Sequence, residues 1–138
     1  MSGTALAQAA STFIGVRFKL YGRDRETGLD CVGLVCACLS AIGRPVEIPR
    51  GYRLRNLSIE QWLPSAAWLE LEPSNKPERA GDVILVQPGP AQQHLMIVEQ
   101  PGSVIHAHAG LRRVVRQPLA QSHTRLMQWR LTATSKDT

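Results

Sequence analysis

Cys31 directly follows Asp30 at the start of an apolar segment, a position in which a thiol can become a nucleophile. The Asp30 side chain can cap a helix that begins there, which leaves Cys31 at the first helical position. The partial positive charge of a helix N-terminus favours the thiolate, so we expect the pKa of Cys31 to be lowered. A thiolate that attacks a carbonyl carbon needs an imidazole to protonate the leaving group. This pattern predicts a cysteine hydrolase.

His94 and His106 are the histidines best placed to complete such a site. A hairpin that turns near Pro101-Gly102 pairs residues whose numbers add up to about 200, which sets His94 opposite His106 on one face of a sheet. We expect His94 to accept the proton of Cys31 and to return it to the leaving amine. His106 would accept a hydrogen bond from the other ring nitrogen of His94. The oxyanion would lie near the backbone N–H of Cys31.

Two alternatives stay open for these histidines. A hairpin displaced by one pair would present His108 to His94 in place of His106. A zinc hydrolase is the other alternative, with ligands drawn from Asp82, His94, His106 and His108. A zinc enzyme would leave the cysteine at the helix start without a role. We therefore favour the cysteine hydrolase, which needs neither a metal nor an organic cofactor.

The composition fits one globular domain over residues 1–138. Hydrophobic residues make up 43% of the chain and charged residues 20%, so disorder is not expected. No apolar run reaches the roughly 20 residues that cross a bilayer, and the first residues lack the pattern of a signal peptide. We expect no membrane insertion, and a cytosolic protein unless it is exported by another route or has been trimmed.

The charge and the cysteines narrow the function further. The net charge of +5 suits an anionic partner, but the basic residues are scattered and not interleaved with aromatic residues. Nucleic-acid binding is therefore not expected. All three cysteines lie within Cys31–Cys38, so they cannot form a disulfide framework. Cys36 and Cys38 lie along the apolar segment and are expected to pack in the core.

These site residues need a helix that begins at a cleft and a sheet beside it. Hydrophobic patterning predicts helices over 4–14 and 31–42, and the second is apolar on every side, as a buried helix is. Between the helices and the sheet we expect a loop, a short helix and a polar connector, over 45–52, 58–69 and 72–80 respectively.

Five short strands are expected in the second half of the chain. They are separated by turns rich in Pro and Gly, and span 82–87, 94–99, 103–107, 113–116 and 125–131. Helices first and hairpin-linked strands after them predict an α+β fold. In this fold the helices pack on an antiparallel meander of about five strands.

The chain resembles the NlpC family of papain-like cell-wall endopeptidases, in particular the compact forms carried by phage tails and prophages. The resemblance covers nearly the whole chain and rests on the order and spacing of its motifs. These are Tyr21-Gly22, Gly28-Leu29-Asp30-Cys31 followed by Gly33, Gly81-Asp82, His94, and Val104-Ile105-His106-Ala107.

The resemblance implies a papain-like α+β fold with a Cys-His-His triad. Cys31 would be the nucleophile, His94 the base and His106 the orienting residue. It also implies cysteine endopeptidase activity on peptidoglycan stem peptides, at the bond between γ-linked D-glutamate and a diamino acid.

Tyr21 and Asp30 are the expected substrate-binding residues. Many relatives have a tyrosine near the position of Phe18 or Lys19, and Tyr21 would take its place here. Because no export signal or wall-binding domain is evident, we expect a phage-associated protein whose partners are peptidoglycan peptides and phage tail proteins. We expect it to stay in the cytoplasm until it is released or incorporated in a phage particle. A structural tail-assembly protein with a degenerate peptidase fold is the alternative. Papain-like folds also include amidases and acyltransferases.

Overall fold

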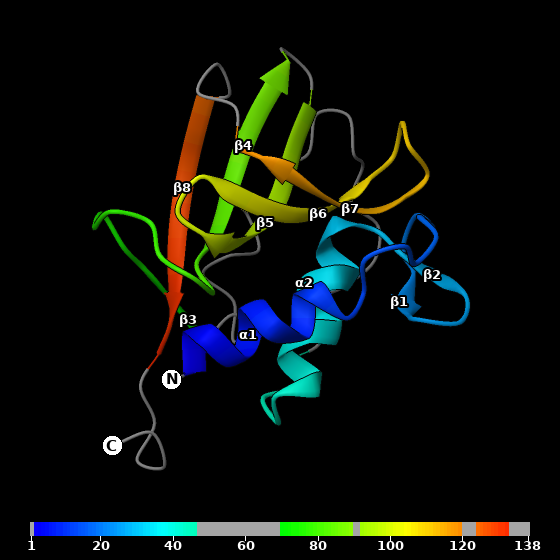
Figure 1. The fold of residues 1–138 in the computed structure, drawn as a ribbon, viewed down its shortest axis with the longest axis horizontal. Coiled ribbons are helices and arrows are strands. Elements are labelled where there is room, and N and C mark those ends of the chain that lie inside the picture. Colours follow the sequence, from blue (N-terminus) through cyan, green and yellow to red (C-terminus); the bar gives the residue numbers. More distant parts are fainter. Residues whose placement is uncertain (1, 47–69, 90–91, 120–123, 133–138) are drawn as a thin grey trace.

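The computed structural model of the chain describes residues 2–46, 70–89, 92–119 and 124–132. These residues form two helices, a two-stranded ribbon and a six-stranded sheet (Figure 1). In chain order the elements are α1 (Ser2–Ser11), β1 (Arg23–Asp24), β2 (Gly28–Leu29), α2 (Cys31–Ala41), β3 (Leu71–Pro73), β4 (Val83–Gly89), β5 (Gln92–Gln100), β6 (Ser103–His108), β7 (Arg113–Pro118) and β8 (Thr124–Leu131). The predicted α+β class is confirmed.

The main sheet is antiparallel, with the strand order β3-β8-β4-β5-β6-β7. Strands β4 to β7 form the expected meander, whereas β8 returns across it to pair with β4. β3 adds an edge strand where we expected the polar connector to begin, so the predicted number of strands is one too few. Three residues are too short to show a periodicity, and Pro73 is tolerated because it lies at an edge.

Both helices pack on one face of the main sheet, where the larger part of the core lies (Figure 1). Along β5, Leu95 and Ile97 belong to this core, whereas Met96 and Val98 belong to a smaller cluster on the opposite face. This alternation is the period of two that a strand with both faces covered shows. The face with Leu95 and Ile97 packs against α2, so this helix lies against the strand that carries the predicted base, His94.

The second helix has the buried character that its sequence predicts. It begins at Cys31 and ends at Ala41, one residue short of the expected end. Its first turn lies against the preceding segment, because a Cβ atom on Gly33 would come within 1.9 Å of the Gly22 carbonyl oxygen. Glycine is therefore required at position 33, and this close approach sets where the helix N-terminus lies.

Two expected elements are not tested. The short helix over 58–69 and most of the loop over 45–52 lie outside the described residues. In the part of the chain that is described, α1 and α2 have 10 and 11 residues, and neither they nor any other helix could span a membrane.

Asp82 is a buried carboxylate just before β4 and accepts two hydrogen bonds from Arg130, each 2.8 Å long. Replacing Arg130 with Met is expected to lower the free energy of unfolding by about 3–5 kcal/mol, because the carboxylate stays buried without its cation. Urea titration measures the loss. Arg116→Met is the matched control, since Arg116 pairs with Glu99 in a solvent-exposed position and its loss should cost only a small fraction of the loss in Arg130→Met. Equal losses in the two variants would contradict this account.

Candidate active site

The Asp30 side chain caps α2, as predicted, and also holds the segment before the helix. Its Oδ1 accepts a hydrogen bond from the backbone N–H of Gly33 at 2.7 Å and lies 3.3 Å from Arg23 Nη1. Its Oδ2 accepts a hydrogen bond from the backbone N–H of Tyr21 at 2.7 Å, where Tyr21 has φ = 64°. The carboxylate is fully buried. These contacts position Cys31, whereas substrate binding by Asp30 or Tyr21 stays a prediction.

The β5–β6 hairpin has a different register from the one we expected. The expected register sets Ile97 opposite Ser103, but the structure sets Ile97 opposite Ile105. The tight turn pairs Gln100 with Ser103, and a bulge between Val98 and Gln100 adds one residue to β5. The register therefore depends on the length of the turn and on this bulge.

The predicted pairing of His94 with His106 is consequently wrong. A continuation of the observed register sets His108 opposite His94 instead. His94 and His106 still have the same parity on their strands, so both side chains emerge on the same face where the strands remain regular.

The N-terminus of α2 meets β5 where that strand leaves β6. Beyond Ile97 and Ile105 the described residues of β5 and β6 are no longer partners. The backbone N–H of Leu95 donates a hydrogen bond to the sulfur of Cys31 at this point. Cys31 therefore lies against the β5 backbone at Leu95, the residue that follows His94 in the chain.

Burial determines the protonation state of Cys31. The residue is 1% exposed, and desolvation together with the adjacent Asp30 carboxylate raises the pKa of Cys31 to about 12. Hydrogen bonds from the backbone N–H groups of Leu95, Val32 and Cys31 lower this pKa but are outweighed. The prediction that the pKa of Cys31 is lowered is therefore wrong, because these hydrogen-bond donors do not compensate for the water that the thiolate loses on burial. The group is a thiol at neutral pH, so nucleophilic attack requires a base.

Cys38 is also buried, and desolvation raises the pKa of both Cys31 and Cys38 from 9.0 to about 12. The folded protein therefore binds more protons than the unfolded chain between pH 9 and about pH 12. The free energy of unfolding should fall as the pH rises through this window, by about 1.4 kcal/mol per pH unit for each thiol. Denaturant titrations across this range measure the slope. Cys38→Ala should remove about half of the thiol contribution, and an unchanged slope would contradict the raised pKa.

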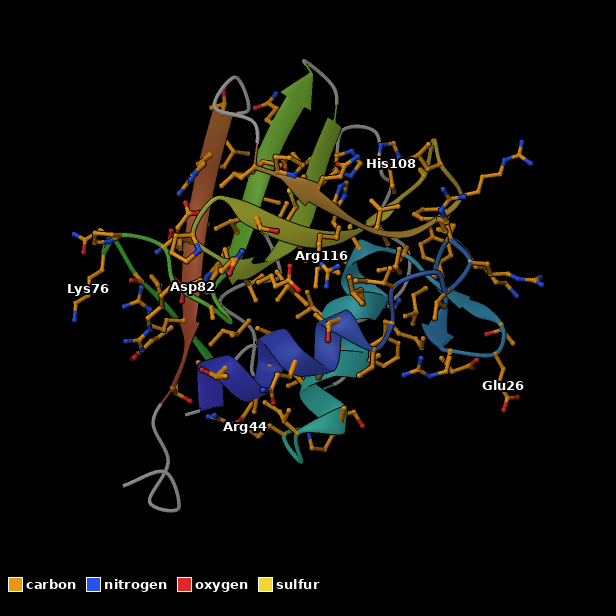
Figure 2. The ribbon with its side chains drawn as sticks, in the orientation of Figure 1. Glu26, Arg44, Lys76, Asp82, His108 and Arg116 are labelled. Carbon is orange, nitrogen blue, oxygen red and sulfur yellow. The ribbon has the colours of Figure 1, made fainter. Side chains whose placement is uncertain are left out.

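His106 and His108 lie together at the end of β6, with ring centroids 5.3 Å apart (His108 is labelled in Figure 2). His106 is 5% exposed, and its Nε2 lies 2.7 Å from Gln117 Oε1 on β7. The Nδ1 of His108 accepts a hydrogen bond from the backbone N–H of Leu111 at 3.1 Å. His94 is half-buried on β5. The structure brings Cys31 to the strand of His94, and the complete triad stays a prediction.

A model of the NlpC/P60 family matches residues 15–133 of the chain, which is most of its length. The chain belongs to the NlpC/P60 family. The resemblance inferred from the motifs is thereby confirmed. A comparison with curated proteins found no match.

Solved structures show the same fold. NlpC2 from Trichomonas vaginalis aligns with 94% of this chain at 17% identity and a TM-score of 0.69. The NlpC/P60 domain of the peptidoglycan hydrolase SagA aligns over 96% of this chain and all of its own, at 22% identity and a TM-score of 0.64. The peptidoglycan hydrolase RipB from Mycobacterium tuberculosis aligns over 96% of this chain and 66% of its own, at 20% identity and a TM-score of 0.60. This chain spans only 46% of NlpC2 and 44% of NlpC1 from the same organism.

The alternative zinc site is not assembled in this NlpC/P60 domain. Within the described residues, no three His, Cys, Asp or Glu side chains are grouped so that they could hold a metal ion. Asp82 is engaged by Arg130 just before β4, whereas His94 pairs with Val86, four residues further along. Four strand residues span about 13 Å, which is too far for two ligands of one ion.

Two groups at the NlpC/P60 site were not found from the sequence. The backbone N–H of Leu95 contacts Cys31 because β5 and β6 separate there, and no local pattern records that separation. The position of Gln117, in contrast, is indicated by the sequence. The turn at Ala109-Gly110 implies a β6–β7 hairpin, and this hairpin pairs Gln117 with Val104, two residues from His106 on the same face.

Proposed function

We propose that this NlpC/P60 domain is a cysteine endopeptidase that hydrolyses peptide bonds in peptidoglycan stem peptides. The observation that carries the proposal is the place of Cys31, first in a capped helix, with its sulfur against the β5 backbone beside His94. The proteins of similar fold include the peptidoglycan hydrolases SagA and RipB. The bond that we propose joins γ-linked D-glutamate to a diamino acid.

The proposed reaction begins with transfer of the Cys31 proton to His94 as the sulfur attacks the carbonyl carbon. The backbone N–H of Cys31 stabilises the oxyanion, and one such donor contributes about 3 kcal/mol. Collapse of the tetrahedral intermediate expels the amine, which takes the proton from His94 and leaves a thioester. Water then gives a proton to His94 and attacks the thioester. The carboxylate leaves, and the thiol regains its proton.

Exposed cations on two segments near the helix start support an anionic peptide as substrate. Arg17 and Lys19 precede the helix, and Arg112 and Arg113 follow β6; all four are exposed. A backbone bridge joins Arg17 to Arg113, so these segments lie side by side. None of the four forms an ion pair with another described residue. Stem peptides carry carboxylates, which such a surface attracts.

A second candidate is a structural domain that keeps the fold without activity. The burial of Cys31 and its raised pKa favour this candidate, because a thiol that solvent does not reach is a poor nucleophile. The two candidates differ in whether His94 can take the proton from the buried thiol when a peptide occupies the site.

Incubation with purified stem peptides, some with diaminopimelate and some with another diamino acid at that position, distinguishes the endopeptidase from the structural domain. Mass spectrometry detects the products. The expected result is two products, one of which begins with the diamino acid and has a new free amino group. EDTA should not change the rate. Intact peptides of both kinds after prolonged incubation would reject the endopeptidase and support the structural domain. Activity that EDTA abolishes would reject the thiol mechanism.

Association with phage tail proteins, and a cytoplasmic location until release, remain part of the proposal. Co-purification of the protein with phage tails, detected by mass spectrometry of intact particles, is the expected result. Its absence from purified particles would reject this part of the proposal and leave the proposed chemistry in place.

A further inference from the structure

We propose that Gln117 is a positioning residue that holds His106 in the tautomer with its proton on Nε2. In this tautomer Nδ1 of His106 carries no proton and can accept the hydrogen bond that the ring N–H of His94 donates in the proposed triad. The inference rests on the proposed function, in which His106 orients His94. It extends that function by a fourth side chain, supplied by the strand beyond β6.

The contact itself is short and lies in a protected place. Gln117 Oε1 lies 2.7 Å from His106 Nε2. Gln117 pairs with Val104 across the β6–β7 ladder, and His106 pairs with Val115. Gln117 and His106 are thus diagonal neighbours on one face, within reach of a long side chain. His106 is 5% exposed and Gln117 is half-buried, so water competes weakly for this hydrogen bond.

The chemistry of the two groups determines the tautomer. A carboxamide oxygen can only accept a hydrogen bond, so the hydrogen between the two atoms belongs to Nε2 of His106. A neutral imidazole has one N–H, and its other nitrogen is then an acceptor. The Nδ1 atom of His106 is buried, where an acceptor has a stronger directional effect than it has in water. In the opposite tautomer Nδ1 of His106 would carry a hydrogen. It could then not accept a hydrogen bond from the ring N–H of His94.

Other titratable groups surround this contact and must be considered in any pH profile. The ring of His108 lies 5.3 Å from that of His106 on the same strand, and Arg113 on β7 pairs with His108. In the proposed triad, His94 on β5 and Cys31 on α2 are the remaining titratable neighbours. The test therefore needs a readout that belongs to His106 alone.

The tautomer of His106 can be read without any activity measurement, by nitrogen-15 NMR of the labelled full-length protein. The expected spectrum of the native protein shows His106 protonated on Nε2 and unprotonated on Nδ1. In Gln117→Met, which keeps the length of the side chain, this preference should weaken into a mixture. Native-like circular dichroism shows that the variant has folded. A His106 tautomer that Gln117→Met leaves unchanged, or a native protein protonated on Nδ1, would overturn the inference.

Kinetics with stem peptides supply the second readout. Gln117→Met should lower kcat by about 10- to 100-fold, the range seen when the hydrogen-bond partner that orients a metal-binding histidine is lost, and should leave KM unchanged. Gln117→Glu keeps an acceptor in place and should restore kcat in alkaline solution. The introduced carboxylate also favours the charged form of His106. As the pH is lowered, the variant should therefore lose activity at a higher pH than the native protein does.

Gln100→Met is the matched control, because Gln100 is exposed at the end of β5, and it should leave both readouts unchanged. A kcat in Gln117→Met equal to that of Gln100→Met would overturn the positioning role. If the native protein cleaves no stem peptide, the proposed function fails, and the NMR readout still decides whether Gln117 sets the tautomer.

Discussion

Replacing Cys31 with Ala is expected to abolish cleavage of stem peptides, with a loss of at least about 10⁴-fold in kcat. The sulfur is the atom that forms the covalent intermediate, and a methyl group at this position cannot form it. Cys31→Ser should be nearly as inactive, since a buried hydroxyl with the same neighbours is harder to ionise than a thiol. Product formation measured by mass spectrometry gives the rate of each variant.

Cys36→Ala is the matched control for this experiment. Cys36 lies on the same helix, is buried like Cys31 and has no proposed role in the reaction. Its replacement should lower stability modestly and leave kcat within about threefold of the native value. Retention of activity in Cys31→Ala, or an equal loss in Cys36→Ala, would show that Cys31 is not the nucleophile.

Replacing Asp30 with Ala is expected to lower the free energy of unfolding by about 3 kcal/mol. The loss combines a missing helix cap with two backbone N–H groups that lose their acceptor, the buried one of Gly33 and the partly buried one of Tyr21. Against a total stability of about 5–15 kcal/mol this is a large fraction, and urea titration measures it directly. Activity should fall as well, because the same contacts position Cys31.

Asp24→Ala is the control for Asp30→Ala. Asp24 also accepts hydrogen bonds from a nearby residue, Thr27, but it is exposed, so its loss should cost only a small fraction of the loss in Asp30→Ala. Equal losses of stability in the two variants would contradict the role of the buried Asp30 contacts.

Asp30→Asn removes the charge of the side chain and keeps its shape. It removes the carboxylate that helps to raise the pKa of Cys31, so alkylation of Cys31 at neutral pH should become faster.

The sequence by itself determined the features that depend on near neighbours. The cap of α2 joins Asp30 to a residue only three positions away, and its geometry follows from the residue types. The five longer strands and both described helices follow from hydrophobic periodicity and from turns that contain Pro or Gly. The motif order around Cys31 and His94 was sufficient to indicate the family.

Only the tertiary structure decided how these pieces meet. The bulge in β5 shifts its register with β6, so that Ile97 pairs with Ile105 and His106 does not lie opposite His94, because one extra residue shifts a whole ladder. Because β5 separates from β6, the backbone N–H of Leu95 is available to donate a hydrogen bond to the sulfur of Cys31. Burial of that thiol raises its pKa, whereas the sequence predicted that the helix N-terminus would lower it. Desolvation depends on every element packed around a group, and those elements come from distant parts of the chain. The turn at Ala109-Gly110 indicates the hairpin that brings β7 beside β6, but the contact between Gln117 and His106 is given only by the side-chain positions in the structure.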